Sequence, residues 1–188
     1  MSSSQVTALL RIELVGVEPL VWRRLRVPLA TSLPNLHRWL QVAFDWEDRQ
    51  PHEFQVGALR FGHPDAEDAP EGLQDESDWT LHNVLATQAE SFSYAYGTDE
   101  SWQHSLVLEP AERTSAGAGF APLCLAGENA APPEELDGPA GYAEFLAALA
   151  DARHPKHERY LEWIGGIFDP HAFDLNRINK TLRKRRKA

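Results

Sequence analysis

The chain has 188 residues, of which 43% are hydrophobic and 24% are charged, with a formal net charge of −10 at pH 7. These values are ordinary for a globular protein, and the length suits one domain with a real hydrophobic core. No apolar run approaches the roughly 18 residues that span a bilayer, so we expect no membrane association. The lone cysteine, Cys124, excludes an intramolecular disulfide and argues against a zinc site built from thiolates. With no signal-peptide pattern at the start, we expect a cytoplasmic protein.

The charge is unevenly distributed along the chain. Residues 177–188 contain seven basic residues and no acidic one, so the preceding residues carry the acidic excess. Cations at the end of a helix complement its dipole, and a solvated helix end is one interpretation of this segment. A nucleic-acid contact is the other, through five consecutive residues: Arg183, Lys184, Arg185, Arg186 and Lys187.

The N-terminal part of the chain has the patterns of a hairpin, a helix and a further strand. Residues 5–16 and 20–28 alternate with a period of two, and the short connection between them favours an antiparallel hairpin. Ser32 is expected to cap an amphipathic helix of about 12 residues. A third strand is predicted over 52–57, and residues 60–62 are expected to continue it.

The middle of the chain is predicted to begin with a loop and to return to strands. Residues 63–78 are rich in acids and read as a solvated loop, because their acid spacing is too open for a calcium loop. Thr80 is expected to cap a short helix. Two strands are then predicted over 91–96 and 102–109.

The C-terminal part is predicted to be helical. Residues 110–137, rich in Ala, Gly and Pro, are expected to be irregular. Helices are predicted over 138–151 and about 155–165, and Asp174 is expected to cap a last one. Strands first and helices last predict an α+β fold. We expect an antiparallel or mixed sheet of about five strands, one packed helix after the first hairpin, and a C-terminal set of three helices.

The predicted domain organisation is simple. A single α+β domain is expected over 1–176, strand-rich over 5–110 and helical over 138–176. Residues 177–188 are expected to be a basic C-terminal tail that continues the last helix.

The stretch 94–104 concentrates aromatic, acidic and histidine side chains between two predicted strands. His104 is expected on the same strand face as Trp102, with Tyr96 across the connection. One interpretation is a histidine hydrogen-bonded inside an aromatic cluster. The other is a general base or ligand contact, assisted by Asp99 or Glu100.

Other candidates are weaker or absent. His52 is predicted to begin the third strand and to face the same patch, with the same two interpretations. Arg23 and Arg24 are candidates for anion contacts or for ion pairs with the acidic body. The chain has no phosphate-binding glycine motif, no nucleophile elbow and no His-Glu-x-x-His pattern, so no metal ligands and no cofactor are predicted.

Motifs spread over roughly residues 6–182 carry a family resemblance. They are 21–28, Leu36-His37, Phe44-Asp45-Trp46, His52-Glu53-Phe54, 96–109, Cys124, Gly127, 132–134, Gly138, Gly141-Tyr142, His154-Pro155, Trp163, Phe168-Asp169-Pro170, Phe173-Asp174 and Asn179. With these motifs the chain resembles the plasmid pRiA4b ORF-3-like proteins.

The resemblance implies an α+β fold and no established activity. Members are bacterial and archaeal, and some occur on plasmids and near mobile elements. This chain departs from the family pattern in its central motif, where Gly97 replaces an acid and Asp99 a glycine. It also has Gln50 where members often carry a histidine, and Ala131 and Leu136 where they often carry cysteines. These departures deplete any site built from acids, paired histidines or thiols.

The sequence leaves two functional hypotheses open. The first is a non-enzymatic binding or interaction module, associated with mobile-element or DNA transactions. Its ligand groove would be formed by Arg23, Arg24, Tyr96, Trp102 and His104, and nucleic acid is the partner expected for the basic tail. The second is a metal-dependent hydrolase or nuclease-like enzyme using His104 and His52 with Asp99 or Glu100.

Overall fold

The structure is a computed structural model, and it describes residues 6–66, 69–98, 102–109 and 121–185 of the chain. Two predicted site residues, Asp99 and Glu100, lie outside the described residues, as do Arg186 and Lys187.

The described strands form one eight-stranded sheet in the order β5-β4-β3-β6-β7-β1-β2-β8. Neighbouring strands pair antiparallel, apart from the short β4 and β5, which pair parallel, so the sheet is mixed. The strands are β1 (Thr7–Leu14), β2 (Trp22–Pro28), β3 (His52–Val56), β4 (Leu59–Gly62), β5 (Gln74–Asp75), β6 (Ser91–Tyr96), β7 (Trp102–Glu109) and β8 (Leu123–Glu128).

The α+β class is confirmed, but the expected number of strands is wrong. β4 is a strand of its own, which pairs with β3 after a turn at Gly57, whose φ is +60°. β5 is only two residues long and lies in the segment expected to be a loop. β8 lies in the segment expected to be irregular, and it includes Ala126 and Gly127, residue types that strands disfavour. Its pairing with β2 supplies what local propensity does not.

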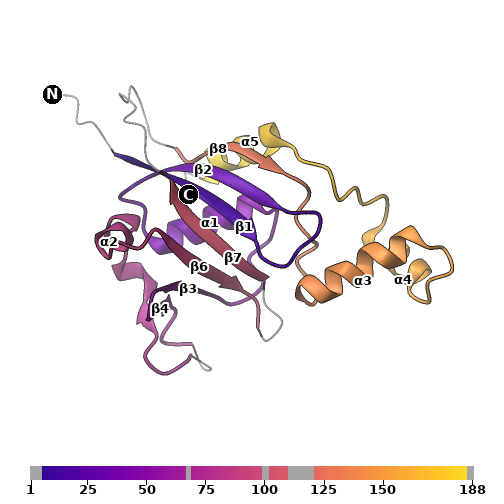
Figure 1. Cartoon of the computed structure of the whole chain (residues 1–188), viewed down its shortest axis with the longest axis horizontal. Coiled ribbons are helices and arrows are strands. Elements are labelled where there is room, and N and C mark those ends of the chain that lie inside the picture. Colours follow the sequence, from indigo (N-terminus) through magenta and orange to yellow (C-terminus); the bar gives the residue numbers. More distant parts are fainter. Residues whose placement is uncertain (1–5, 67–68, 99–101, 110–120, 186–188) are drawn as a thin grey trace.

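Across the described residues the chain forms five α-helices. α1 lies against one face of the sheet, α5 runs beside β8, and α3 and α4 project to one side of the sheet (Figure 1). The helices are α1 (Leu33–Ala43), α2 (Leu81–Ala86), α3 (Gly138–Ala150), α4 (His157–Ile164) and α5 (Leu175–Arg185), with a short 3₁₀ helix, η1 (Glu76–Asp78), after β5.

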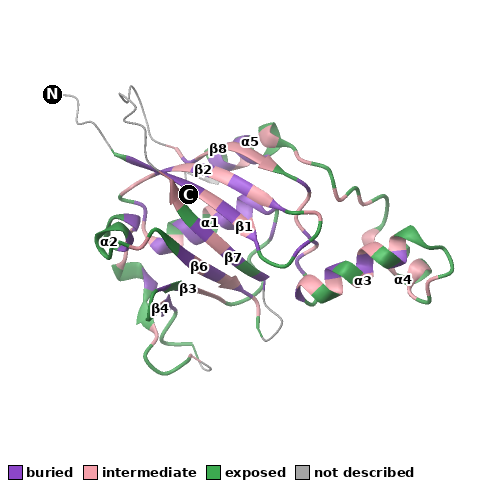
Figure 2. Ribbon diagram, in the orientation of Figure 1, coloured by how far each residue is buried: buried purple, intermediate pink, exposed green. Residues whose placement is uncertain are grey.

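The core lies between α1 and the sheet. Pro34 sits in the first turn of α1, where its missing N–H costs nothing, and Leu33, Leu36 and Leu40 recur on the buried face. Each such leucine contributes about 1.5–3 kcal/mol by leaving water. The strands contribute core residues such as Leu10 from the face that α1 covers. Buried and less buried residues follow one another along the strands, as the colours of Figure 2 show.

α5 packs on the body at residues that the sequence assigned to a tail. Ile178 and Leu182 are buried. The Asn179 side chain accepts a hydrogen bond from the Cys124 backbone N–H and donates one to its carbonyl, each at 2.8 Å. The start of the predicted tail is therefore part of the domain. No helix in the described part of the chain is long and apolar enough to cross a membrane.

Candidate functional site

The predicted aromatic and histidine patch lies in the core. Tyr96, Trp102 and His104 are 0%, 2% and 1% exposed. The His104 ring packs edge-on against Phe44 and Trp46, with centroids 4.7 and 5.4 Å away. Burial lowers the pKa of His104 to about 4, so its imidazole is neutral at pH 7. The ring is enclosed by packed side chains, and this arrangement fits the interpretation of a histidine inside an aromatic cluster.

The two predicted ligand-binding arginines lie on opposite faces of the sheet. Arg23 is buried and donates hydrogen bonds to four backbone carbonyls, those of Trp22, Ala43, Glu128 and Asn129, at 2.7–2.9 Å. Burial lowers its pKa to about 10, which leaves it charged at pH 7.

Arg24 points away from that face, and its Nε donates to Glu109 Oε2 at 2.6 Å. A single groove that joins both arginines to Tyr96, Trp102 and His104 is therefore not formed. Alternation along β2 already separates adjacent side chains to opposite faces.

The Tyr96 hydroxyl has a structural partner. It donates to the buried carboxylate of Glu134 and accepts the backbone N–H of Arg49 at 2.8 Å. Glu134 in turn accepts the N–H groups of Glu47 and Arg49 at 2.7 and 2.9 Å. These bonds hold the loop between α1 and β3. Asp48, in the middle of this loop, has a φ of 61°, a left-handed conformation that non-glycine residues adopt rarely.

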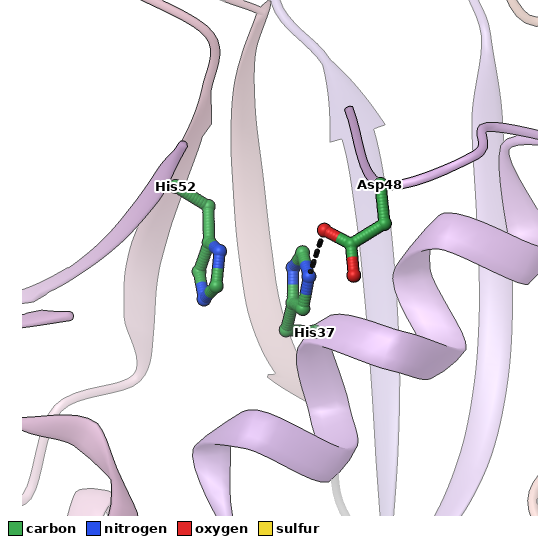
Figure 3. Close-up of side chains that lie close together, drawn as sticks. All are labelled: His37, Asp48 and His52. Atoms are coloured by element: carbon green, nitrogen blue, oxygen red, sulfur yellow. Dashed lines mark hydrogen bonds and ion pairs between the residues drawn. The ribbon is translucent and has the colours of Figure 1, made fainter. Parts of the chain in front are cut away.

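In this conformation of the α1–β3 loop, the Asp48 carboxylate lies beside His37 of α1. Asp48 Oδ1 lies 2.8 Å from His37 Nε2 (Figure 3). The Tyr94 hydroxyl lies 2.7 Å from His37 Nδ1. Gln41 donates to the same hydroxyl at 3.0 Å and accepts the Asp48 N–H at 3.0 Å. Burial, and then the neighbouring His52, lower the pKa of His37 to about 4. His37 is thus a neutral imidazole bonded at both nitrogens.

His52, at the start of β3, lies face to face with His37. The two rings are 3.5 Å apart at their centroids and 5° from parallel (Figure 3). His52 Nε2 lies 2.8 Å from Glu76 Oε2, and His63 Nε2 lies 3.7 Å from Glu76 Oε1. His37, Asp48, His52, His63 and Glu76, named here the histidine cluster, offer imidazole nitrogens and carboxylate oxygens, the donors that divalent metal ions use.

Sequence reasoning found only one member of this cluster as a candidate, His52. His37 entered the sequence analysis only as part of the family motif Leu36-His37, and no role was assigned to it. Glu76 and His63 fall in the segment that was expected to be a solvated acidic loop, yet Glu76 is 1% exposed. The buried Glu76 starts η1, and no periodic pattern distinguishes it from its acidic neighbours.

Apart from the histidine cluster, a cavity of about 640 Å³ lies between the C-terminal end of α1 and α5. Its walls include four aromatic rings and one ion pair. Arg177 Nη2 donates to both carboxylate oxygens of Asp45 at 2.8 Å. The aromatic residues that line it are Phe44, Trp46, Phe168 and Phe173.

Comparisons with known proteins place this geometry in one family. The family described as "Plasmid pRiA4b ORF-3-like protein" matches residues 7–177. The uncharacterized protein y4hQ of Sinorhizobium fredii (strain NBRC 101917 / NGR234) is 37% identical over 175 residues, which cover 92% of this chain and 89% of the relative. A crystal structure of the protein of unknown function MM3350 from Methanosarcina mazei Go1 is similar with a TM-score of 0.81 and 30% identity, covering 92% of this chain and 97% of that one.

Proposed function

The chain belongs to the plasmid pRiA4b ORF-3-like family, and we propose that it is a non-enzymatic binding module whose ligand occupies the cavity between α1 and α5. The ligand class is a small zwitterion with an apolar body, such as an α-amino acid with an aromatic side chain.

The cavity is the observation that carries this proposal. Its volume of about 640 Å³ lies within the roughly 300–1,000 Å³ typical of small-molecule sites. It combines apolar rings with a small number of charged groups, which is also typical of such sites.

The ion pair at the cavity favours a zwitterion. The side chains of Asp45 and Arg177 are 68% and 66% exposed, so water screens the attraction between them. Breaking this ion pair to admit a ligand therefore costs little free energy. A ligand carboxylate can replace Asp45 on Arg177, and a ligand ammonium can replace Arg177 on Asp45. A ligand with only one of these charges leaves one partner of the pair unpaired.

The aromatic wall favours an apolar or aromatic body. The guanidinium of Arg23 lies 5.3 Å from the Phe44 ring centroid and 4.8 Å from that of Phe173. Its N–H groups are occupied by backbone carbonyls, so it holds the wall together and gives the pocket a fixed shape. The remaining ring surface is available for packing against a ligand ring.

Calorimetric titration with L-phenylalanine, 3-phenylpropionate and phenethylamine tests the proposal. We expect saturable binding of L-phenylalanine, and binding weaker by up to about fivefold for each of the other two, because each makes only one of the two water-screened charge contacts. Asp45→Asn and Arg177→Gln are expected to weaken L-phenylalanine binding by a similar factor. Arg153→Gln, which removes an exposed ion pair with Asp151 far along the chain, is the matched control. Absence of binding, or equal binding by wild type and Arg177→Gln, contradicts the proposal.

A metal-dependent hydrolase or nuclease is the second candidate, and one observation favours it. The bonded Asp48, His37 and Tyr94 form a chain of groups of the kind that accepts protons beside a reacting water. Cleavage of a single-stranded oligonucleotide in Mn²⁺ or Zn²⁺, lost in His37→Asn, is the expected result for an enzyme. No cleavage with either ion by wild type removes this candidate.

Association with DNA is a further part of the proposal, and it depends on the end of α5. Arg183 and Lys184 are exposed on this helix. Two exposed cations support a polyanion contact but specify no sequence, because phosphate contacts position a protein without reading bases.

A further inference from the structure

In the histidine cluster, two histidines from separate segments, His52 and His63, lie against the buried carboxylate of Glu76. His52 is the first residue of β3, His63 directly follows β4, and Glu76 is the first residue of η1. We propose that His52, His63 and Glu76 bind a divalent transition metal ion, with Zn²⁺ as the ion that fits this donor set best. The sequence predicted no metal ligands, so this proposal revises that expectation.

The distances between the donor atoms fit a bound ion. His52 Nε2 lies 2.8 Å from Glu76 Oε2, His63 Nε2 lies 3.7 Å from Glu76 Oε1, and ligand atoms of the three residues all lie within 4.8 Å of one another. Around a tetrahedral zinc ion with bonds of about 2.0–2.2 Å, donor atoms are roughly 3.4 Å apart. The observed separations lie on both sides of that value, so binding an ion requires two small movements: the Glu76 carboxylate shifts away from His52, and the exposed His63 ring turns towards it.

The buried carboxylate supplies a physical reason for a cation at this place. Glu76 is 1% exposed, and among the described residues its carboxylate meets only His52 and His63 as side-chain partners. A carboxylate removed from water needs hydrogen-bond donors or a cation beside it, and a metal ion between the two imidazoles is such a cation. A metal ion satisfies both oxygens and both imidazoles at once.

The cluster has an inner side and an outer side. The His52 side chain is 5% exposed, whereas that of His63 is 66% exposed. An ion bound between them is reachable from solvent on the His63 side. Two histidines and one carboxylate leave coordination positions for water there, as in sites that keep an open position.

His37 and Asp48 support the site without joining it. The rings of His37 and His52 are parallel and 3.5 Å apart, so their nitrogen lone pairs lie in two separate parallel planes and do not converge on one ion. His37 is fixed by Asp48 and the Tyr94 hydroxyl, and its ring covers one face of His52. This contact sets the plane of the His52 imidazole, the role that outer partners of metal ligands commonly have.

Titration of chelator-treated protein with Co²⁺ and Zn²⁺ tests the proposal. Loss of an outer partner alone costs about 10–100-fold in metal affinity, so loss of a direct ligand is expected to cost roughly 100-fold or more. Wild type is expected to bind one equivalent of Zn²⁺ by calorimetry. Co²⁺ is expected to give the visible absorption of a nitrogen and oxygen site with fewer than six ligands. His63→Ala and Glu76→Gln are expected to lose this binding.

The control is His82→Ala, which removes an exposed histidine on α2 outside the cluster, and it is expected to bind as wild type does. His63 is exposed, so His63→Ala is expected to fold even where the buried Glu76→Gln does not. Equal Zn²⁺ affinity in wild type and His63→Ala overturns the proposal, and so does the absence of stoichiometric binding by wild type.

Discussion

Two regions of the molecule place histidine among aromatic rings on the same side of the sheet, and they differ in their polar partners. His104, on the central strand β7, is surrounded by rings and by backbone, and among the described residues its Nε2 has no hydrogen-bond partner. His37 and His52, nearer the β3 side, meet the carboxylates of Asp48 and Glu76. Histidines on the same side of the sheet are thus surrounded by aromatic rings in one region and paired with carboxylates in the other.

The carboxylates make the difference. Asp48 lies in the α1–β3 loop, where Glu134 accepts the backbone N–H groups of its two neighbours, Glu47 and Arg49, and Glu76 is the first residue of η1, after the two-residue strand β5. The α1–β3 loop also reaches His104, but there it contributes the ring of Trp46, which packs edge-on at 5.4 Å. The residue that a loop presents to each histidine therefore decides whether that histidine meets a carboxylate or an aromatic ring.

The largest expected effect is on the pH dependence of stability, to which both regions contribute, because the pKa values of His104 and His37 are both lowered to about 4. The pKa of His104 is lowered to about 4 from 6.5, so the unfolded chain takes up a proton between these values and the folded chain does not. Stability is therefore fully present above pH 6.5 and falls as pH drops towards 4. His104 accounts for about 3 kcal/mol of the unfolding free energy that is lost between pH 7 and pH 4.

Urea unfolding at pH 7 and pH 4 measures this share. His104→Gln removes the titrating group, so its free energy of unfolding is expected to fall by about 3 kcal/mol less than that of wild type. His82→Gln, at an exposed position, is expected to keep the wild-type dependence. An identical fall in wild type and His104→Gln means that His104 is not a neutral core residue.

A smaller effect, on Zn²⁺ affinity, is expected from Asp48→Asn, which removes the charge of the side chain but keeps its shape. Asparagine tolerates the left-handed backbone at this position and can still accept the His37 N–H bond. We expect Asp48→Asn to weaken Zn²⁺ binding by about tenfold. The free energy of unfolding is expected to change by less than about 1 kcal/mol, because the side chain is 47% exposed. Unaltered Zn²⁺ affinity shows that Asp48 does not support the site.

The smallest effect on stability is expected at the end of α5. Deleting residues 177–188 is a poor test of DNA binding, because it removes the buried Ile178 and Leu182. Arg183→Gln with Lys184→Gln is sharper, and it is expected to change the free energy of unfolding by less than about 0.5 kcal/mol. Where the tail binds DNA, the slope of log affinity against log salt falls by about 0.9 for each lost contact. An unchanged slope contradicts a role for these two residues.

The sequence predicts which residues share a face of one strand, but it does not predict contacts between residues that are far apart in the chain. Alternation correctly places Trp102, His104 and Leu106 on one buried face. It cannot indicate that Glu76 lies 2.8 Å from a histidine 24 residues earlier, because nothing periodic links a loop residue to a strand. β8 is missed for a related reason: its strand is specified by pairing with β2, which is about 100 residues away, and not by its own residues.

Anomalous X-ray scattering from crystals grown with Zn²⁺ is the sharpest test of a metal site at His52, His63 and Glu76, since it locates the ion without reference to affinity. We expect a peak at the zinc edge about 2.0–2.2 Å from the imidazole nitrogens of His52 and His63 and from the Glu76 carboxylate, with none beside His104. A map whose peaks lie only at other histidines, such as the exposed His82 or His171, or a map with no peak, contradicts it.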